Sequence, residues 1–313
     1  MNKGTCIVAI GGNAILTEYN EGTIKEQMEN ISVACEKIVQ LVKEGYKVVL
    51  THGNGPQVGQ TLLRHKISSH TVSEGTLDTC GAETQGLLGY LIQQGLRNHL
   101  AQAGINTEVV SVVTQVLVDK DDPAFKNPTK PIGPFYSEEE ACRLAREYNK
   151  HIIEDSGRGY RIVVPSPQPV DIIEKNTIEA LVDSGAIVIA AGGGGIPVVK
   201  IDDQLVGVEA VIDKDFASSV LASMIKADYL LLLTGVDKVC INFRKPNERQ
   251  LDQMSIAEAT SYLAEGQFPE GSMAPKVRAA MSFVKNGGQK ALITTLGNME
   301  LALAGKAGTA VNM

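Results

Sequence analysis

Strand-like runs that end in glycine turns and lead into helical patterns recur along this chain of 313 residues. The run TCIVAI stops at Gly11 and Gly12, YKVVLT stops at HGNG, and AIVIAA stops at four glycines, residues 192–195. Repeated strand–turn–helix units favour parallel strands, because the helix returns the chain to the same end of the sheet. The pattern predicts an α/β fold in which helices cover both faces of a mostly parallel sheet and ligands bind at the carboxyl ends of the strands.

Local signals mark the ends of several elements. Thr23 and Glu26 have the spacing of a capping box, and they precede a helical pattern that ends at Gly45. Ser272 is placed to cap another helix, over about residues 273–285. The charged stretch NFRKPNERQLD predicts a hairpin.

Composition limits the classes of partner. The net charge of −7 argues against a nucleic-acid-binding protein, because such proteins present a basic face. Glycine and proline interrupt the apolar runs well before the length of a membrane span, and the N-terminus has no pattern of a cleavable signal. Five scattered cysteines without a C-x-x-C pair, and histidines without metal-ligand spacing, favour a reducing compartment and no protein metal site. We therefore expect a cytoplasmic protein that binds neither nucleic acid nor a membrane.

One stretch, from about residue 119 to 168, breaks the alternation of strands and helices. It holds half of the chain's 12 prolines and shows little sheet pattern before YRIVVP. A proline-rich connection of this length is typical of a lid or of a disordered linker. Its aromatic residues, such as Phe125, Phe135 and Tyr136, favour an ordered segment. We expect a small subdomain that projects from the main sheet.

Three glycine turns are candidates for a shared anion site. They are Gly11-Gly12-Asn13, Gly53-Asn54-Gly55 and the turn that contains Gly193 and Gly194. Glycine lets the backbone approach an anion closely, and a following helix N-terminus adds partial positive charge. Each turn by itself has the alternative of a simple tight connection between strand and helix. The standard dinucleotide, P-loop and nucleophile-elbow motifs are absent, since GNGPQVG misses G-x-G-x-x-G by one residue.

Two lysines stand where a cation is unfavourable unless an anion is close. Lys214 stands at the start of a predicted helix, and Lys276 follows Pro275 near the start of another. A cation at a helix N-terminus opposes the helix dipole, so both lysines are candidates for function. Asp215 fits the first turn of a helix in any case, which leaves its role open on the pattern alone. Lys130, between prolines, is by itself typical of a solubilising surface charge.

Taken together and in order, these motifs resemble carbamate kinases of the amino-acid kinase superfamily. The segments are AIGGNAI, THGNGPQVG, DTCGAETQGLLGY, FKNPTKPIGPF, RIVVPSPQP, GGGGIPVV, GVEAVIDKDFAS, LLLTGVDKV and GSMAPKV. The resemblance covers essentially the whole chain, and FKNPTKPIGPF and VIDKDFAS are its specific parts. It implies a three-layer αβα sandwich with an open, mainly parallel sheet, a projecting lid subdomain and a homodimer.

The resemblance also implies an activity and a division of the chain. The reaction is reversible phosphoryl transfer from ATP to carbamate, often run toward ATP during arginine, agmatine or purine-derivative breakdown. A single domain over residues 1–313 would comprise a carbamate-binding half, 1–207, which includes the lid at 119–168, and a nucleotide-binding half, 208–313. Magnesium would enter as the nucleotide complex.

The implied site residues fall into three groups. The catalytic group is Lys130, Lys214, Asp215 and Lys276. The group that binds carbamate or carbamoyl phosphate is Gly11, Gly12, Asn13, Gly53, Asn54, Gly55, Gly193 and Gly194. The nucleotide group is Lys214, Thr234, Gly235, Val236, Asp237, Val239, Met273, Pro275 and Lys276.

Two competing functions stay open. The first is a related kinase that phosphorylates a carboxylate such as that of acetylglutamate. Those relatives usually carry a lysine two residues before the first glycine, where this chain has Ala9. The second is a catalytically silent nucleotide sensor, against which the retained Lys130, Lys214, Asp215 and Lys276 count.

Overall fold

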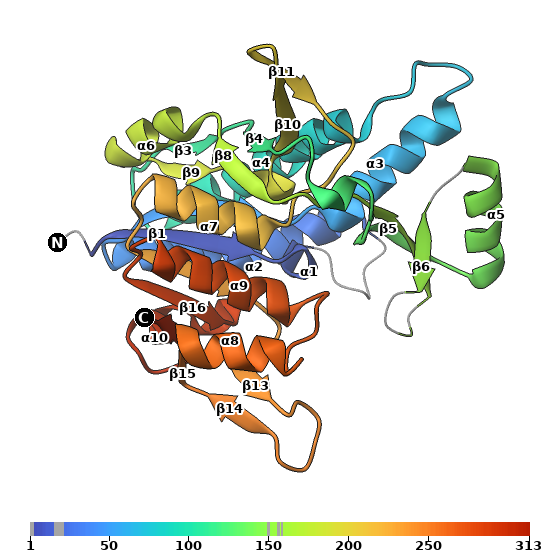
Figure 1. Ribbon diagram of the computed structural model, residues 1–313. Helices are drawn as coiled ribbons and strands as arrows, with labels where there is room; N and C mark the ends of the chain where they lie inside the picture. The colour runs from blue at the N-terminus through green and yellow to red at the C-terminus, as the bar shows by residue number, and fades with distance from the viewer. Residues whose placement is uncertain (1–2, 16–21, 149–150, 155–156, 158) are drawn as a thin grey trace.

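The centre of the computed structural model is one eight-stranded sheet (Figure 1); the structure describes residues 3–15, 22–148, 151–154, 157 and 159–313. Neighbouring strands run parallel, except that β16 and β17 are antiparallel. In spatial order the strands are β15 (Gln253–Ser255), β17 (Thr309–Asn312), β16 (Lys290–Thr294), β12 (Tyr229–Leu233), β1 (Thr5–Ile10), β2 (Lys47–His52), β9 (Ile187–Ile189) and β3 (Val109–Ser111). The predicted mainly parallel sheet is confirmed. The sheet includes strands from both predicted halves of the chain, 1–207 and 208–313, because β1 of the first half pairs with β12 of the second.

Strand β1 shows why helices cover both faces. Its side chains alternate, so Ile7 and Ala9 lie in one hydrophobic core, whereas Cys6, Val8 and Ile10 lie in the other. The first core is covered by α6 (Lys175–Asp183), α7 (Lys214–Met224), α8 (Ile256–Ala264) and α9 (Met273–Lys285). The second is covered by α2 (Ile24–Lys43), α4 (Leu77–Gln102) and α10 (Met299–Leu303). The fold is therefore the expected three-layer αβα sandwich (Figure 1).

The local predictions have mixed outcomes. The capping box of Thr23 and Glu26 is present at the start of α2, and β13 (Val239–Ile241) pairs with β14 (Arg249–Leu251) in the predicted hairpin. The predicted side-chain cap by Ser272 is wrong. The amide of Ala274 instead donates to the carbonyl of Pro269 at 3.0 Å, so the preceding turn provides the acceptor that the helix end needs.

The projecting subdomain is confirmed, with a later start than expected. A three-stranded antiparallel sheet, β5 (Lys130–Tyr136), β7 (Tyr160–Val164) and β6 (Ile152–Glu154), lies with α5 (Glu138–Tyr148) at the right of Figure 1. Strand β5 contains two prolines, and it tolerates them because it is an edge strand of this sheet. The earlier residues of the stretch, with β4 (Gln115–Val118) and η1 (Pro123–Phe125), belong to the main body. There β4 joins a second sheet with β8 (Pro169–Ile172), β10 (Ile196–Ile201) and β11 (Gln204–Gly207).

A close backbone contact holds the subdomain against α3 (Gly55–Ser68). A Cβ built on Gly59 would lie 2.0 Å from Cα of Gly133, which is nearer than any real side chain comes. Gly133 itself has φ of +74°, a left-handed conformation that favours glycine. Because Gly55 is the first residue of α3, this contact ties the subdomain to the helix that begins at the second glycine turn.

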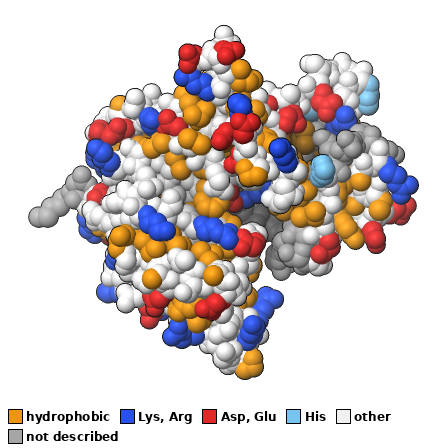
Figure 2. All heavy atoms as spheres, in the orientation of Figure 1, with side chains coloured by type: hydrophobic (Ala, Val, Ile, Leu, Met, Phe, Trp, Pro, Cys, Tyr) orange, Lys and Arg blue, Asp and Glu red, His pale blue; other side chains and the backbone are white. Residues whose placement is uncertain are grey.

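Figure 2 shows acidic and basic side chains interspersed on the face that it views. Among the residues that the structure describes, no helix combines the length and the apolar character that crossing a membrane requires.

Candidate functional site

Two helices bring a buried cluster of charges together. Lys214 is the first residue of α7, and Lys276 lies in the first turn of α9, as the sequence predicted. Asp215 joins them: Oδ1 accepts from Nζ of Lys214 at 2.5 Å, and Oδ2 accepts from Nζ of Lys276 at 2.9 Å. Asp215 is 4% exposed and Lys276 is 9% exposed. The carboxylate is thus the anion that the two lysines require near helix N-termini.

Burial and charge together shift the pKa values of this cluster. Burial lowers the pKa of Lys214 to about 8, and the neighbouring Lys276 cation adds to the effect while Asp215 opposes it. Burial by itself would raise the pKa of Asp215, but the two lysines outweigh it and hold that pKa well below its usual range. For Lys276, burial opposes the charge, yet Asp215 raises its pKa above the ordinary value. Lys214 is therefore the cation of the pair that loses its proton more readily.

The first two glycine turns meet beside Lys214. Gly11 follows β1, Gly12 begins the short helix α1 (Gly12–Ile15) and Gly53 follows β2. Because β1 and β2 pair in parallel, both turns lie at the carboxyl end of the sheet. A Cβ built on Gly53 would lie 2.8 Å from N of Gly12 and 3.5 Å from Cδ of Lys214. The side chain of Asn13 lies outside the part of the chain that the structure describes.

The third turn, η2 (Gly192–Gly194), links the second turn to the entry of α7. A Cβ built on Gly193 would lie 2.2 Å from Nδ2 of Asn54. A Cβ built on Gly194 would lie 2.1 Å from the carbonyl oxygen of Ile212, two residues before Lys214. The structure thus brings the three predicted turns and Lys214 into one site, where a side chain at Gly53, Gly193 or Gly194 would collide with the neighbouring chain.

Lys130 reaches this site from the subdomain through a residue that the sequence reasoning missed. Nζ of Lys130, at the start of β5, donates to Oδ2 of Asp213 at 2.5 Å. Oδ1 of the same carboxylate accepts from the backbone amide of Asp215 at 2.9 Å and so caps α7. An aspartate directly before a predicted helix start is itself an N-cap signal, and this signal could have identified Asp213.

The predicted nucleotide residues lie in two places. Met273 and Pro275 are in the first turn of α9, beside Lys276. The others, Thr234, Gly235, Val236, Asp237 and Val239, follow β12, whose parallel pairing with β1 places the start of this segment next to the first glycine turn. Asp237 fixes this loop, since Oδ1 accepts from Nδ2 of Asn298 at 2.8 Å and from Oγ1 of Thr295 at 3.2 Å. Asn298 ends η3 (Leu296–Asn298). The side chain of Val239 is fully buried in the core, and its backbone amide donates to Oγ1 of Thr309 at 2.8 Å.

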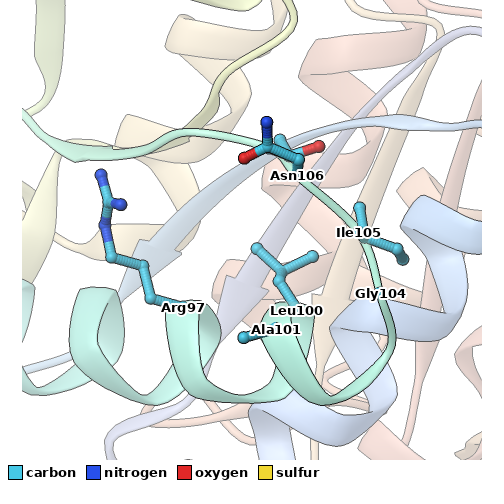
Figure 3. A pocket seen from close by; sticks show the side chains of 7 residues that line it. Arg97, Leu100, Ala101, Gly104, Ile105 and Asn106 are labelled. Carbon is cyan, nitrogen blue, oxygen red and sulfur yellow. The ribbon is translucent and has the colours of Figure 1, made fainter.

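Two surface cavities lie away from this site. One, of about 340 Å³, is at the C-terminal end of α4, where Arg97, Leu100 and Ile105 contribute to its lining (Figure 3). Another, of about 490 Å³, includes Lys290 and Lys306. The first cavity precedes β3 and so lies at the amino end of that strand, whereas the lining of the second comes from β15, β16, β17 and the segment before β17, at one edge of the sheet.

Comparison with known proteins agrees with this geometry. Residues 4–295 match the model of the amino acid kinase family. The chain is 48% identical over 307 residues to a carbamate kinase of Pyrococcus horikoshii, covering 97% of this chain and 98% of that one. It is 47% identical over 310 residues to a carbamate kinase of Clostridium perfringens, covering 97% and 98%. A solved structure of carbamate kinase from Giardia lamblia bound to AMP-PNP has a TM-score of 0.91 at 44% identity, with 99% and 98% of the two chains covered. The chain therefore belongs to the carbamate kinases of the amino acid kinase family.

Proposed function

We propose that this chain is an enzyme that transfers a phosphoryl group reversibly between ATP and carbamate, giving ADP and carbamoyl phosphate. The observation that carries this proposal is the buried cluster of Lys214, Asp215 and Lys276 beside the three glycine turns. Fixed cations and helix N-termini are the groups that stabilise a phosphoryl group in transfer. The family membership, through relatives that are named carbamate kinases, supports the choice of acceptor.

In the direction of ATP synthesis, an oxygen of the β-phosphate of ADP attacks phosphorus of carbamoyl phosphate. The new P–O bond forms as the bond between phosphorus and the carbamate oxygen breaks, and carbamate leaves with the electron pair. The attacking oxygen of ADP is already an anion and carbamate leaves as an anion, so the step needs neither a general base nor a general acid. What it requires is alignment and neutralisation of the charge on the transferring group, which we assign to Lys214 and Lys276.

The parts of the site divide between the two substrates. We propose that the turns at Gly11–Gly12 and Gly53–Asn54 bind the carbamate end, with Gly55, Gly193, Gly194 and Asn13 as their partners. The loop after β12 and the first turn of α9 would bind the nucleotide. Asp215 would orient both lysines, because each of its oxygens accepts from one of them.

Magnesium fits this site as part of the nucleotide complex. Both oxygens of Asp215 already accept from lysines, and the described residues contain no group of three or more side chains suited to hold a metal ion. Phosphate oxygens and water would therefore be the main ligands of the ion. Bound in this way, magnesium supplies positive charge next to the phosphates.

A coupled assay of ATP formation from ADP, carbamoyl phosphate and magnesium tests the proposal. We expect ATP formation by the folded chain. Activity with ATP and acetylglutamate but none with carbamoyl phosphate would favour the related carboxylate kinase. Nucleotide binding without either activity would favour the silent sensor.

The pKa of Lys214 predicts how kcat/KM changes at alkaline pH. Burial lowers this pKa to about 8, so the free enzyme loses the Lys214 cation as the pH rises through that value. We expect kcat/KM for carbamoyl phosphate to fall above pH of about 8, because kcat/KM reports ionisations of the free enzyme. Lys214→Arg should remove this fall, whatever its absolute rate, since a guanidinium keeps its charge. A wild-type profile that stays flat through strongly alkaline pH would contradict the role.

Replacing Lys130 tests the contribution of the subdomain. We expect Lys130→Met to lower kcat and to raise KM for carbamoyl phosphate by about tenfold or more, the effect of losing one hydrogen bond to a charged group. The dissociation constant of ADP should change little. Lys126→Met, which alters an exposed lysine of the same segment, is the matched control. Unchanged kinetics would show that Lys130 is only a surface charge.

We also propose that the enzyme works toward ATP, as a cytoplasmic homodimer. Carbamoyl phosphate is a mixed anhydride, so transfer to ADP is downhill, which suits breakdown of arginine, agmatine or purine derivatives. All five cysteines are free, in keeping with a reducing compartment.

The second sheet exposes Val170, Ile201, Leu205 and Val206, apolar side chains that a partner could cover. Light scattering coupled to size exclusion tests the dimer.

A further inference from the structure

The turn that carries Gly193 and Gly194 has a strained backbone. Ala191 has φ of +49°, and Gly193, Gly194 and Gly195 have φ of +66°, +92° and +89°. An alanine in the left-handed region is costly and persists only where its surroundings fix it. Backbone strain of this kind indicates that the position of the turn matters for function.

Two buried polar side chains, of Gln85 and Thr114, hold this turn. On α4, Nε2 of Gln85 donates to the carbonyl of Gly192 at 3.0 Å and to that of Thr114 at 3.1 Å, while Oε1 accepts from the amide of Thr114 at 2.8 Å. Oγ1 of Thr114 accepts from the amide of Ala191 at 2.9 Å and donates to the carbonyl of Val112 at 2.7 Å. Gln85 is 3% exposed and Thr114 is fully buried. Water therefore cannot replace these bonds.

A third side chain limits movement of the turn toward β2. A Cβ on Gly192 would lie 2.4 Å from Nε2 of His52, so the imidazole lies directly against this residue. The other ring nitrogen donates to the carbonyl of Gly53 at 3.2 Å. Burial lowers the pKa of His52 to about 4, which keeps the ring neutral at physiological pH. The ring thus acts as an uncharged steric stop against the turn.

We infer that Gln85 and Thr114 are positioning residues for catalysis, which act by fixing the turn between Asn54 and the entry of α7. The turn touches Asn54 through Gly193 and the carbonyl of Ile212 through Gly194. A displaced turn would therefore move the proposed carbamate contacts and the backbone that leads to Lys214. The inference rests on the proposed function, because it assigns the turn to the carbamoyl phosphate side of the site. The nucleotide loop after β12 does not depend on it.

Matched variants test the inference. Gln85→Met removes all three hydrogen bonds of the amide at similar volume, and Thr114→Val removes the hydroxyl at similar volume. We expect each to raise KM for carbamoyl phosphate at least about tenfold, the effect of one lost hydrogen bond, with the dissociation constant of ADP unchanged. Thr114→Ser keeps the hydroxyl and should restore most of the affinity. Gln102→Met, at the exposed end of α4, is the control.

Hydrogen exchange supplies a measurement that does not depend on activity. Amides of residues 191–195 should exchange faster in Gln85→Met and Thr114→Val than in the wild type, while those of β12 stay protected. Normal KM and normal exchange in an active enzyme would overturn the inference. Equal weakening of ADP and carbamoyl phosphate binding would also overturn it, because that result indicates general loss of structure. An inactive wild type with faster exchange in the variants would reject the proposed function and leave the role in holding the turn intact.

Discussion

The rate of ATP formation is expected to fall by about a hundred- to thousandfold when Lys214 is replaced by methionine, the usual effect of removing one charge that acts in the transition state. Methionine keeps the apolar stem that packs near Gly53, so the cavity stays filled while the cation is lost. Lys276→Met should have an effect of the same size, since both cations bind the same carboxylate and face the same site. Steady-state kcat with saturating ADP and carbamoyl phosphate is the measurement.

The control for both lysines is Lys285→Met, which changes an exposed lysine in the last turn of α9. Its kcat should match the wild type within experimental error. Near-normal turnover in Lys214→Met or in Lys276→Met would reject the catalytic role of that residue. Loss of rate together with loss of folded protein, judged by circular dichroism, would show that the lysine serves the fold instead.

Asp215→Asn is expected to destabilise the folded chain by about 3–5 kcal/mol, the cost of removing one partner from a buried ion pair. The substitution keeps the shape but leaves Lys214 and Lys276 buried without their anion. It should also abolish most activity, because the two lysines lose the group that orients them. Urea denaturation at neutral pH measures the free energy of unfolding.

The stability lost in Asp215→Asn should depend on pH in a defined direction. The folded pKa of Asp215 lies below its usual range, so the wild-type advantage should be lost as the pH falls below about 4, where an unfolded aspartate takes up its proton. As the pH rises toward about 8, the difference in unfolding free energy between wild type and Asp215→Asn should become smaller. Lys214 of the variant lacks its anion and therefore gives up its proton at a lower pH than Lys214 of the wild type. Asp183→Asn, which breaks an exposed pair with Lys47, should cost no more than about 1 kcal/mol. Equal effects of the two substitutions would contradict the argument.

Much of the fold could be predicted because it depends on near neighbours in the chain. The capping box of Thr23 and Glu26 spans four residues, and the strand and helix periods repeat over similar distances. The strand β5 was missed because its prolines argue against a strand, and only its edge position in the three-stranded sheet resolves the conflict. The cap expected from Ser272 failed because a turn that starts at Pro269 supplied the acceptor. Local signals therefore predict where elements begin and end more reliably than they predict which group satisfies each hydrogen bond.

The functional residues divide in the same way. Lys214 and Lys276 could be singled out because a cation near a helix N-terminus is unfavourable without a nearby anion, and this rule needs only local sequence. The ion pair of Lys130 with Asp213 joins residues 83 positions apart, and no local signal pairs them. The contact of Gln85 with Gly192 spans 107 positions and depends on the packing of α4 against η2. Such pairs form only after the whole sheet has assembled.

The sequence by itself determined the class of fold, the glycine turns at the strand ends and the lysines at the helix starts. It did so because strand period, helix capping and the helix dipole act over a few residues. Only the tertiary structure decided that Asp215 is shared by Lys214 and Lys276 and that Gly12, Gly53 and Gly193 meet beside them. These meetings follow from the strand order and from packing over the full sheet, in which residues distant in the chain become neighbours. The turn after β1 carries no lysine, and the lysine that the fold brings beside the glycine turns, Lys214, comes from the start of α7.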